Sequence, residues 1–204
     1  MTDIAFASLI CSRLCHDLVG PVGALSNGIE LMELEDDPTM AQDALELLKQ
    51  SADSATRRLK FLRLAFGASG GDAMPLAVND ARSAALAFFA DHRLELDWPA
   101  HTGPEPQKNR VRLALNLIMS AAFGLIRGGR LSVEIGGDRL VITGSHPSAG
   151  IPDQVMQALA GTAQARDVED ARIIEAFNAS LLAEAEGLQI RVANTPGFFE
   201  IAAV

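Results

Sequence analysis

Apolar residues in the first third of the chain recur with the period of an α-helix. They form two stripes with alternating steps of three and four residues, a spacing that keeps every member on one side of a helix. The first stripe predicts a helix over residues 3–35, and the second predicts a helix over residues 38–66. The first stripe comprises Ala7, Cys11, Leu14, Leu18, Val22, Leu25, Ile29 and Met32, and the second comprises Ala41, Leu45, Leu48, Ala52, Ala55, Leu59, Leu62 and Phe66.

Turn-forming residues flank the second of these helices. Asp37 is a favoured N-cap, and Pro38 suits the first helical position. The glycines of residues 67–71 end the helix and predict a hinge, so residues 1–70 are expected to form a helical-hairpin domain. A lone hairpin cannot bury both stripes, and we therefore predict that two chains pair into a homodimeric four-helix bundle.

Beyond the hinge, short apolar runs alternate with longer helical patterns. Strands are predicted at residues 74–79, 93–98, 130–135, 139–143, 188–193 and 197–203. Helices are predicted at residues 80–91, 107–126, 151–159 and 167–186. This order predicts an α/β sandwich over residues 71–204, a sheet with helices on one face. The fold class expected for the whole chain is therefore α+β.

Composition limits the classes of partner. The chain has 204 residues and a formal net charge of −9, which argues against binding nucleic acid. The first residues do not resemble a secretory signal, and the longest apolar run, residues 113–126, is too short to span a bilayer. We expect a cytoplasmic protein that does not associate with membranes. Cys11 and Cys15 are expected to be small buried residues in a reducing compartment.

His16 is the candidate for chemistry. It lies two positions from Leu14 and from Leu18, so its side chain is expected to point away from the apolar stripe. Its expected neighbours on the helix surface are small or polar, and they are Ser12, Arg13, Val19, Gly20, Gly23 and Asn27. Each glycine costs a helix about 1 kcal/mol relative to alanine. A reason to keep the glycines is clearance, because a bulky partner must bring its backbone close to the imidazole.

An exposed histidine suits the relay of a phosphoryl group. A neutral ring nitrogen is nucleophilic near neutral pH. Arg13, one turn earlier, would help to neutralise the phosphoryl oxygens, and Asp17 would accept a hydrogen bond from the other ring nitrogen and fix the tautomer. No carboxylate cluster in the sequence resembles a magnesium site, so the metal is expected on the partner.

Two other interpretations of His16 are a plain surface histidine and part of a haem-attachment motif. A lone histidine beside a helix bend is more often a plain surface residue, and it is the glycines and Pro21 that reverse this preference. Cys11 to His16 is one residue longer than the C-x-x-C-H motif of haem attachment, so haem is not expected. His92, His101 and His146 are expected to be solvated.

The segment from Ser12 to Leu31 resembles the phosphoacceptor box of sensor histidine kinases. His16 is followed by Asp17, and Pro21 comes five residues after the histidine. The segment resembles the ChpT family of histidine phosphotransferases more closely still. That resemblance implies a dimer formed through the hairpin and a C-terminal domain similar to a kinase ATPase domain that has degenerated.

Departures from the kinase pattern concern the nucleotide site. Ser120 replaces the metal-binding asparagine that follows Asn116, and His146 replaces the aspartate that reads adenine. The glycine-rich lid motif is missing, and no P-loop motif occurs. The resemblance therefore implies no ATP binding, no cofactor held by this chain, and Mg²⁺ on the partner receiver domain.

The resemblance also implies partners. His16 would accept phosphate from the receiver domain of a CckA-like hybrid histidine kinase and pass it to CtrA-like and CpdR-like response regulators. The receivers would dock on the face of the hairpin that carries His16. Two alternatives stay open. One is an ATP-dependent histidine kinase with an atypical nucleotide site, and the other is a non-catalytic module that binds a receiver or kinase.

Overall fold

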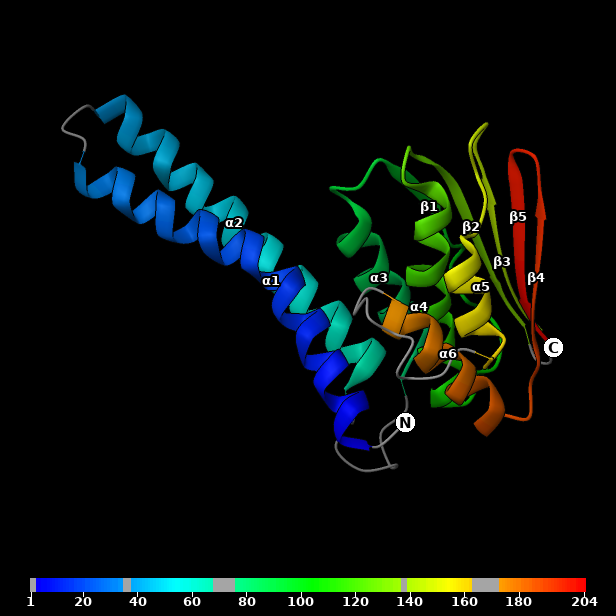
Figure 1. The fold of residues 1–204 in the computed structure, drawn as a ribbon. Coiled ribbons are helices and arrows are strands. Elements are labelled where there is room, and N and C mark those ends of the chain that lie inside the picture. Colours follow the sequence, from blue (N-terminus) through cyan, green and yellow to red (C-terminus); the bar gives the residue numbers. More distant parts are fainter. Residues whose placement is uncertain (1–2, 35–37, 68–75, 137–138, 163–172) are drawn as a thin grey trace.

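A computed structural model describes residues 3–34, 38–67, 76–136, 139–162 and 173–204 of the chain. These residues form a long helical hairpin beside a helix-covered sheet (Figure 1). The hairpin extends well beyond the second unit, so that part of it packs on that unit and part stands clear (Figure 1). The predicted α+β fold class is confirmed. The expected boundary after residue 70 lies outside the described residues.

The hairpin consists of α1 (Asp3–Leu34) and α2 (Pro38–Phe66), as the two apolar stripes predict. Helix α1 continues through Pro21 without interruption. The two helices pack closely at Gly28, where an added Cβ would lie 2.9 Å from the Leu48 side chain. The predicted N-cap, Asp37, lies outside the described residues.

The sheet has the order β1-β2-β3-β5-β4. Its strands are β1 (Leu94–Asp97), β2 (Gly129–Ile135), β3 (Leu140–Ser145), β4 (Ile190–Thr195) and β5 (Phe198–Ala203). Strand β1 pairs in parallel with β2, and the remaining pairs are antiparallel. This topology follows the chain order closely, since consecutive antiparallel strands form hairpins.

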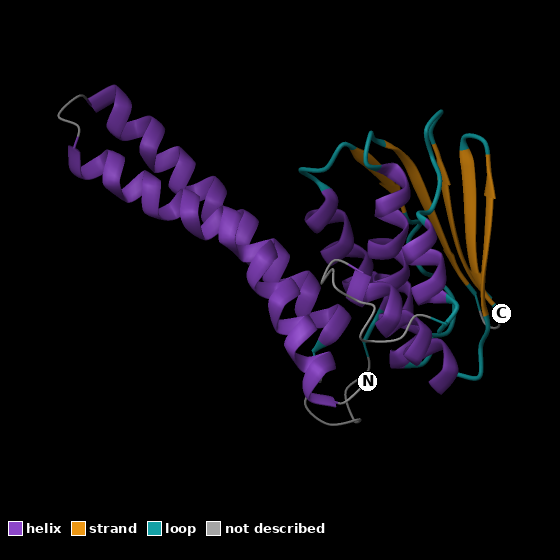
Figure 2. Cartoon of the chain, in the orientation of Figure 1, coloured by secondary structure: helices purple, strands orange, loops and turns teal. Residues whose placement is uncertain are grey.

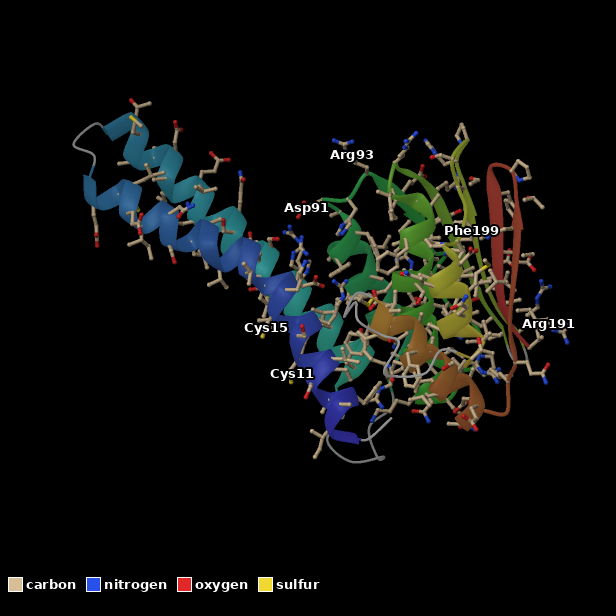
Figure 3. The ribbon with its side chains drawn as sticks, viewed as in Figure 1. Cys11, Cys15, Asp91, Arg93, Arg191 and Phe199 are labelled. Carbon is tan, nitrogen blue, oxygen red and sulfur yellow. The ribbon has the colours of Figure 1, made fainter. Side chains whose placement is uncertain are left out.

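Helices cover one face of this sheet (Figure 2). They are α3 (Val78–Phe89), α4 (Lys108–Ala122), α5 (Asp153–Leu159) and α6 (Ile174–Ala185), with a 3₁₀ turn, η1 (Phe123–Leu125), after α4. Phe199 is fully buried between the two layers (Figure 3). Its ring requires two glycines, because an added Cβ at Gly144 or Gly124 would lie within 2.6 Å of it.

The strand predicted at residues 74–79 is wrong over its described part. Leu76 and Ala77 are not in a strand, and Val78 begins α3. The Glu105 carboxylate accepts a hydrogen bond from the Val78 backbone N–H at 2.9 Å, so an acid from a distant loop caps this helix. Leu76 and Val78 are buried, which explains why the run looked like a strand.

Other predicted elements are present with shifted ends. The helix predicted at 167–186 is described from Ile174, and residues 167–172 lie outside the described part. Strand β4 begins two residues later than predicted, at Ile190. Residues 137 and 138, between the strands predicted at 130–135 and 139–143, also lie outside the described residues.

The prediction that Cys11 and Cys15 are buried is wrong. Both thiols are exposed and lie on the side of α1 that faces away from the C-terminal unit (Figure 3). Helix α2 covers only one flank of the α1 stripe, which leaves the other flank bare. We call this bare strip the open apolar face of α1, and it consists of Ile4, Cys11, Cys15, Val22 and Ile29.

Candidate functional site

His16 projects from α1 into solvent. Its side chain is 65% exposed, as expected from its position off the apolar stripe. The side chain of the next residue, Asp17, is buried against the rest of the chain and is only 6% exposed. A reactive ring is thus held at the surface by a neighbour that is anchored inside.

Asp17 holds the imidazole by one ring nitrogen. His16 Nδ1 lies 3.3 Å from Asp17 Oδ1, at the long end of hydrogen-bond distances. A carboxylate can only accept a hydrogen bond, so the neutral ring carries its proton on Nδ1. The lone pair on Nε2 is then available to attack an electrophile.

Arg13 holds Asp17 in turn. Its Nη1 donates to the same oxygen, Asp17 Oδ1, over 2.6 Å, and its side chain is 12% exposed. We expected Arg13 to neutralise phosphoryl oxygens, and that role stays a prediction. In this structure the guanidinium is directed at carboxylates at the junction between hairpin and C-terminal unit.

Glu175 is the second of these carboxylates, and the sequence analysis missed it. It lies in the first turn of α6, it is fully buried, and its Oε2 is 3.6 Å from Arg13 Nε. The signal was present in the sequence, because an acid directly after Ile173 and Ile174 falls on an apolar run. A buried carboxylate requires a cation, and sequence alone could not show that Arg13 supplies it.

A cavity of about 240 Å³ lies next to this group of charges. Its walls come from both helices of the hairpin and, in the C-terminal unit, from α3, α4, η1 and α6. They include Arg13, Asp17, Arg58, Phe88, Phe89, His92, Met119 and Glu175. The cavity therefore lies in the junction between the hairpin and the C-terminal unit, next to the Asp17 side chain that contacts His16.

His92 lines this cavity, although we expected it to be solvated. Its ring stacks on Phe88 at a centroid distance of 5.3 Å and also touches Phe89. Burial, and then the positive charge of Arg58, lower the pKa of His92, against the opposing effects of Asp91, the Phe88 backbone and Asp17. His92 therefore tends to stay neutral.

The surface around His16 is open, as predicted. Ser12, Val19, Gly20, Gly23 and Asn27 are all exposed. Apart from the backbone of α1 itself, no described atom lies within 4 Å of a Cβ built at Gly20 or Gly23. The fold of one chain therefore gives no reason for these glycines.

Gly20 also borders a groove of about 550 Å³. One wall is the hairpin, and the other is the turn after α3, at Asp91, where Figure 3 shows the two units facing each other. Arg57 of α2 reaches Asp91 across the groove, with 2.5 Å between Nη2 and Oδ2. Both units of the chain thus border the surface near His16.

Two of the three positions compared above with a kinase nucleotide site are closed to solvent. Asn116 and Ser120 of α4 are fully buried. The Asn116 amide donates to the Ala65 carbonyl of α2 at 3.1 Å and accepts a bond from Asn178 of α6 at 3.1 Å. Ser120 donates to the Asn116 carbonyl. These polar groups are satisfied within the protein.

Among the residues that the structure describes, no group of three or more His, Cys, Asp or Glu side chains is placed to hold a metal ion. None of the described helices combines the length and the apolar character needed to cross a membrane.

Comparisons with known proteins define the class as phosphotransferases. The family model for the histidine phosphotransferase C-terminal domain matches residues 78–197. Protein phosphotransferase ChpT of Brucella abortus (strain 2308) is 34% identical over 196 residues, which cover 94% of this chain and 91% of that protein.

A solved structure of a bacterial phosphotransferase resembles the whole chain. It is 31% identical, the match covers 100% of this chain and 98% of the other, and the TM-score is 0.83. The chain therefore belongs to the histidine phosphotransferase family. Its function is phosphoryl transfer in a phosphorelay.

Proposed function

We propose that His16 is the residue that carries the phosphoryl group. It accepts the group from an aspartate of one receiver domain and hands it to an aspartate of another, without ATP. The observation that carries this proposal is the exposed imidazole, whose Nδ1 faces Asp17 at 3.3 Å while Nε2 is directed away from it.

The chemistry balances without an external reagent. The Nε2 lone pair attacks phosphorus in the aspartyl phosphate, an N–P bond forms, and the P–O bond to the aspartate breaks with its electron pair returning to the carboxylate. The Nδ1 proton stays on the ring, where Asp17 offsets the positive charge that develops. A second receiver's carboxylate reverses these steps by attacking the same phosphorus, and the electron pair of the N–P bond returns to Nε2.

The exposed face around His16 is the proposed docking surface for both receivers. Ser12, Val19, Gly20, Gly23 and Asn27 form it, and the two glycines leave room for a partner's backbone. Val19 is 69% exposed and offers the partner an apolar contact. The receiver domain would bring the Mg²⁺ and the carboxylates that bind it, and this chain holds no cofactor.

The independence from ATP rests on Asn116 and Ser120. Both side chains are buried and bonded to protein groups. A nucleotide that used them would have to break the bond that joins Asn116 to the Ala65 carbonyl and leave that carbonyl without its donor. This arrangement favours a phosphotransferase over an ATP-dependent kinase.

The assembly proposed is a homodimer in the cytoplasm. The open apolar face of α1 would be covered by the hairpin of a second copy in a four-helix bundle. Because the chain is similar to a ChpT protein, we propose a CckA-like hybrid kinase as donor and CtrA-like and CpdR-like regulators as acceptors.

A reconstituted relay tests the proposal. A phosphorylated donor receiver, this chain and an unphosphorylated acceptor receiver are mixed without ATP, and label on the acceptor is followed with time. The chain should speed the transfer, and His16→Ala should abolish the effect. A variant that still docks the receivers and still supports relay would instead favour the non-catalytic binding module.

A further inference from the structure

Glu175 connects the phosphoacceptor to the C-terminal unit through a continuous series of contacts. Its Oε2 lies 3.6 Å from Arg13 Nε, Arg13 Nη1 lies 2.6 Å from Asp17 Oδ1, and the same oxygen lies 3.3 Å from His16 Nδ1. The first three members are buried or nearly so, and only His16 is exposed.

We propose that Glu175 is a positioning residue for phosphoryl transfer, acting on His16 through Arg13 and Asp17. The inference rests on the proposed role of His16. The C-terminal unit then has a role in the chemistry besides docking a receiver. Through Glu175 it determines which ring nitrogen of His16 is protonated.

The geometry of the guanidinium supports this role. Arginine presents its N–H groups in a rigid planar fork. The 3.6 Å between Arg13 Nε and Glu175 Oε2 is an ion-pair distance, longer than a hydrogen bond, and the attraction between these charges favours one orientation of the fork. Glu175 is fully buried in α6, so it offers a fixed point for that contact. With Arg13 hydrogen-bonded to Asp17 and attracted by the charge of Glu175, Asp17 Oδ1 is kept where Nδ1 of His16 can donate to it.

Burial keeps water away from these ion pairs. Asp17 and Glu175 are 6% and 0% exposed, so water cannot replace Arg13 as their partner without the junction opening. Phe6 of α1 packs on Phe177 of α6, with ring centroids 6.0 Å apart, and this contact holds the same two helices together. Phe177 is therefore a site where the junction can be weakened without altering the charges.

The test compares four variants of the full chain. Glu175→Gln keeps the shape and removes the charge, while Glu175→Asp keeps the charge on a shorter side chain. Glu184→Gln removes an exposed charge from the same helix, and Phe177→Leu loosens the junction without changing charge. Each is measured in two ways, by the tautomer of His16 from ¹⁵N NMR shifts and by the single-turnover rate of phosphoryl uptake from a phosphorylated receiver.

We expect Glu175→Gln to lower the fraction of His16 protonated at Nδ1 and to slow uptake by about tenfold, as the loss of an outer positioning group does elsewhere. Glu175→Asp should recover part of both. Glu184→Gln should leave the tautomer as in the parent chain, and Phe177→Leu, which keeps every charge but loosens the junction, should shift the tautomer less than Glu175→Gln does. A folded Glu175→Gln variant with an unchanged tautomer and rate overturns the inference.

Two outcomes separate this inference from the proposed function. If the parent chain takes up no label on His16, the proposed function fails, whereas the tautomer shift in Glu175→Gln still decides whether the series of contacts operates. If Glu175→Gln does not fold, Arg13→Lys takes its place, because a lysine ammonium cannot bridge two carboxylates as the guanidinium does. An unchanged tautomer and rate in that folded variant overturn the inference equally.

Discussion

At the scale of single residues, Gly20 and Gly23 are positions where alanine would stabilise the helix but obstruct a docked partner. Neither has a described neighbour that an added methyl group would meet, whereas Gly28 on the same helix faces Leu48. A helix gains about 1 kcal/mol from alanine in place of glycine. The fold therefore tolerates a substitution at Gly20 or Gly23 that a docked partner would not.

We expect Gly20→Ala and Gly23→Ala each to raise Tm by about 2–4 °C, the shift that about 1 kcal/mol gives in a chain of this size. Both should slow uptake of phosphate from a receiver. Gly28→Ala is the matched control, and it should lower Tm because its Cβ would press on Leu48. Calorimetry measures Tm, and single-turnover assays measure the transfer rate. Faster or unchanged transfer in both variants would contradict the claim that these glycines leave room for a partner's backbone.

His92 gives the site a dependence on pH. Its pKa lies below the ordinary value of 6.5, first through burial and then through Arg58. The unfolded chain therefore binds this proton more readily than the folded chain, so stability falls as pH drops below about 6.5. Titration of the His92 ring by NMR should show the lowered pKa, and His92→Gln should reduce the loss of Tm between pH 7 and pH 5. An unshifted titration would contradict this account.

At the scale of elements, periodicity predicted the hairpin almost to the residue, because both helices are long and each carries a regular stripe. The strand predicted before α3 failed for a reason that lies elsewhere in the chain. Glu105 caps α3 from a loop that follows β1, and no local pattern reveals such a contact. The same limit hid Glu175, whose partner Arg13 is more than a hundred residues away.

His16 and its open neighbours were predictable, because they depend on helix geometry within a few turns. The burial of Cys11 and Cys15 was predicted wrongly, since the stripe does not say which of its flanks α2 covers. The positions of a stripe show which face of a helix is apolar, but which part of that face another helix covers depends on tertiary packing.

Asn116 shows how an element of the C-terminal unit holds the hairpin. Its amide bonds to the Ala65 carbonyl near the end of α2 and to Asn178 of α6. Asn116→Ala should lower the free energy of unfolding by about 1–3 kcal/mol, because the buried Ala65 carbonyl and the partly buried Asn178 amide lose their partner. Asn109→Ala, on the same helix but outside this contact, is the control. Urea unfolding measures both, and equal stabilities would contradict the role of Asn116.

At the scale of the whole molecule, the long hairpin leaves apolar surface bare along α1. Val22 and Ile29 are each about half exposed, and both lie on the open apolar face. Burial of that face between two copies is the simplest way to remove it from water. The dimer would leave the His16 side free, because His16 points to a different side of α1.

Ile29→Glu should therefore weaken self-association by more than about tenfold, since it places a charge in an apolar interface. The hairpin should stay helical, because the Ile29 side chain is 52% exposed on α1. Glu30→Gln, the next residue on a polar side, serves as control. Sedimentation equilibrium decides the matter, and a monomeric parent chain would contradict the proposed dimer.

The most direct measurement mixes the chain with a receiver domain that carries labelled phosphate, in the absence of ATP. The account predicts that the chain acquires label that is lost in acid and kept in base, and that peptide mapping places it on His16. Label that maps to another residue, or uptake that requires ATP, would contradict the central claim.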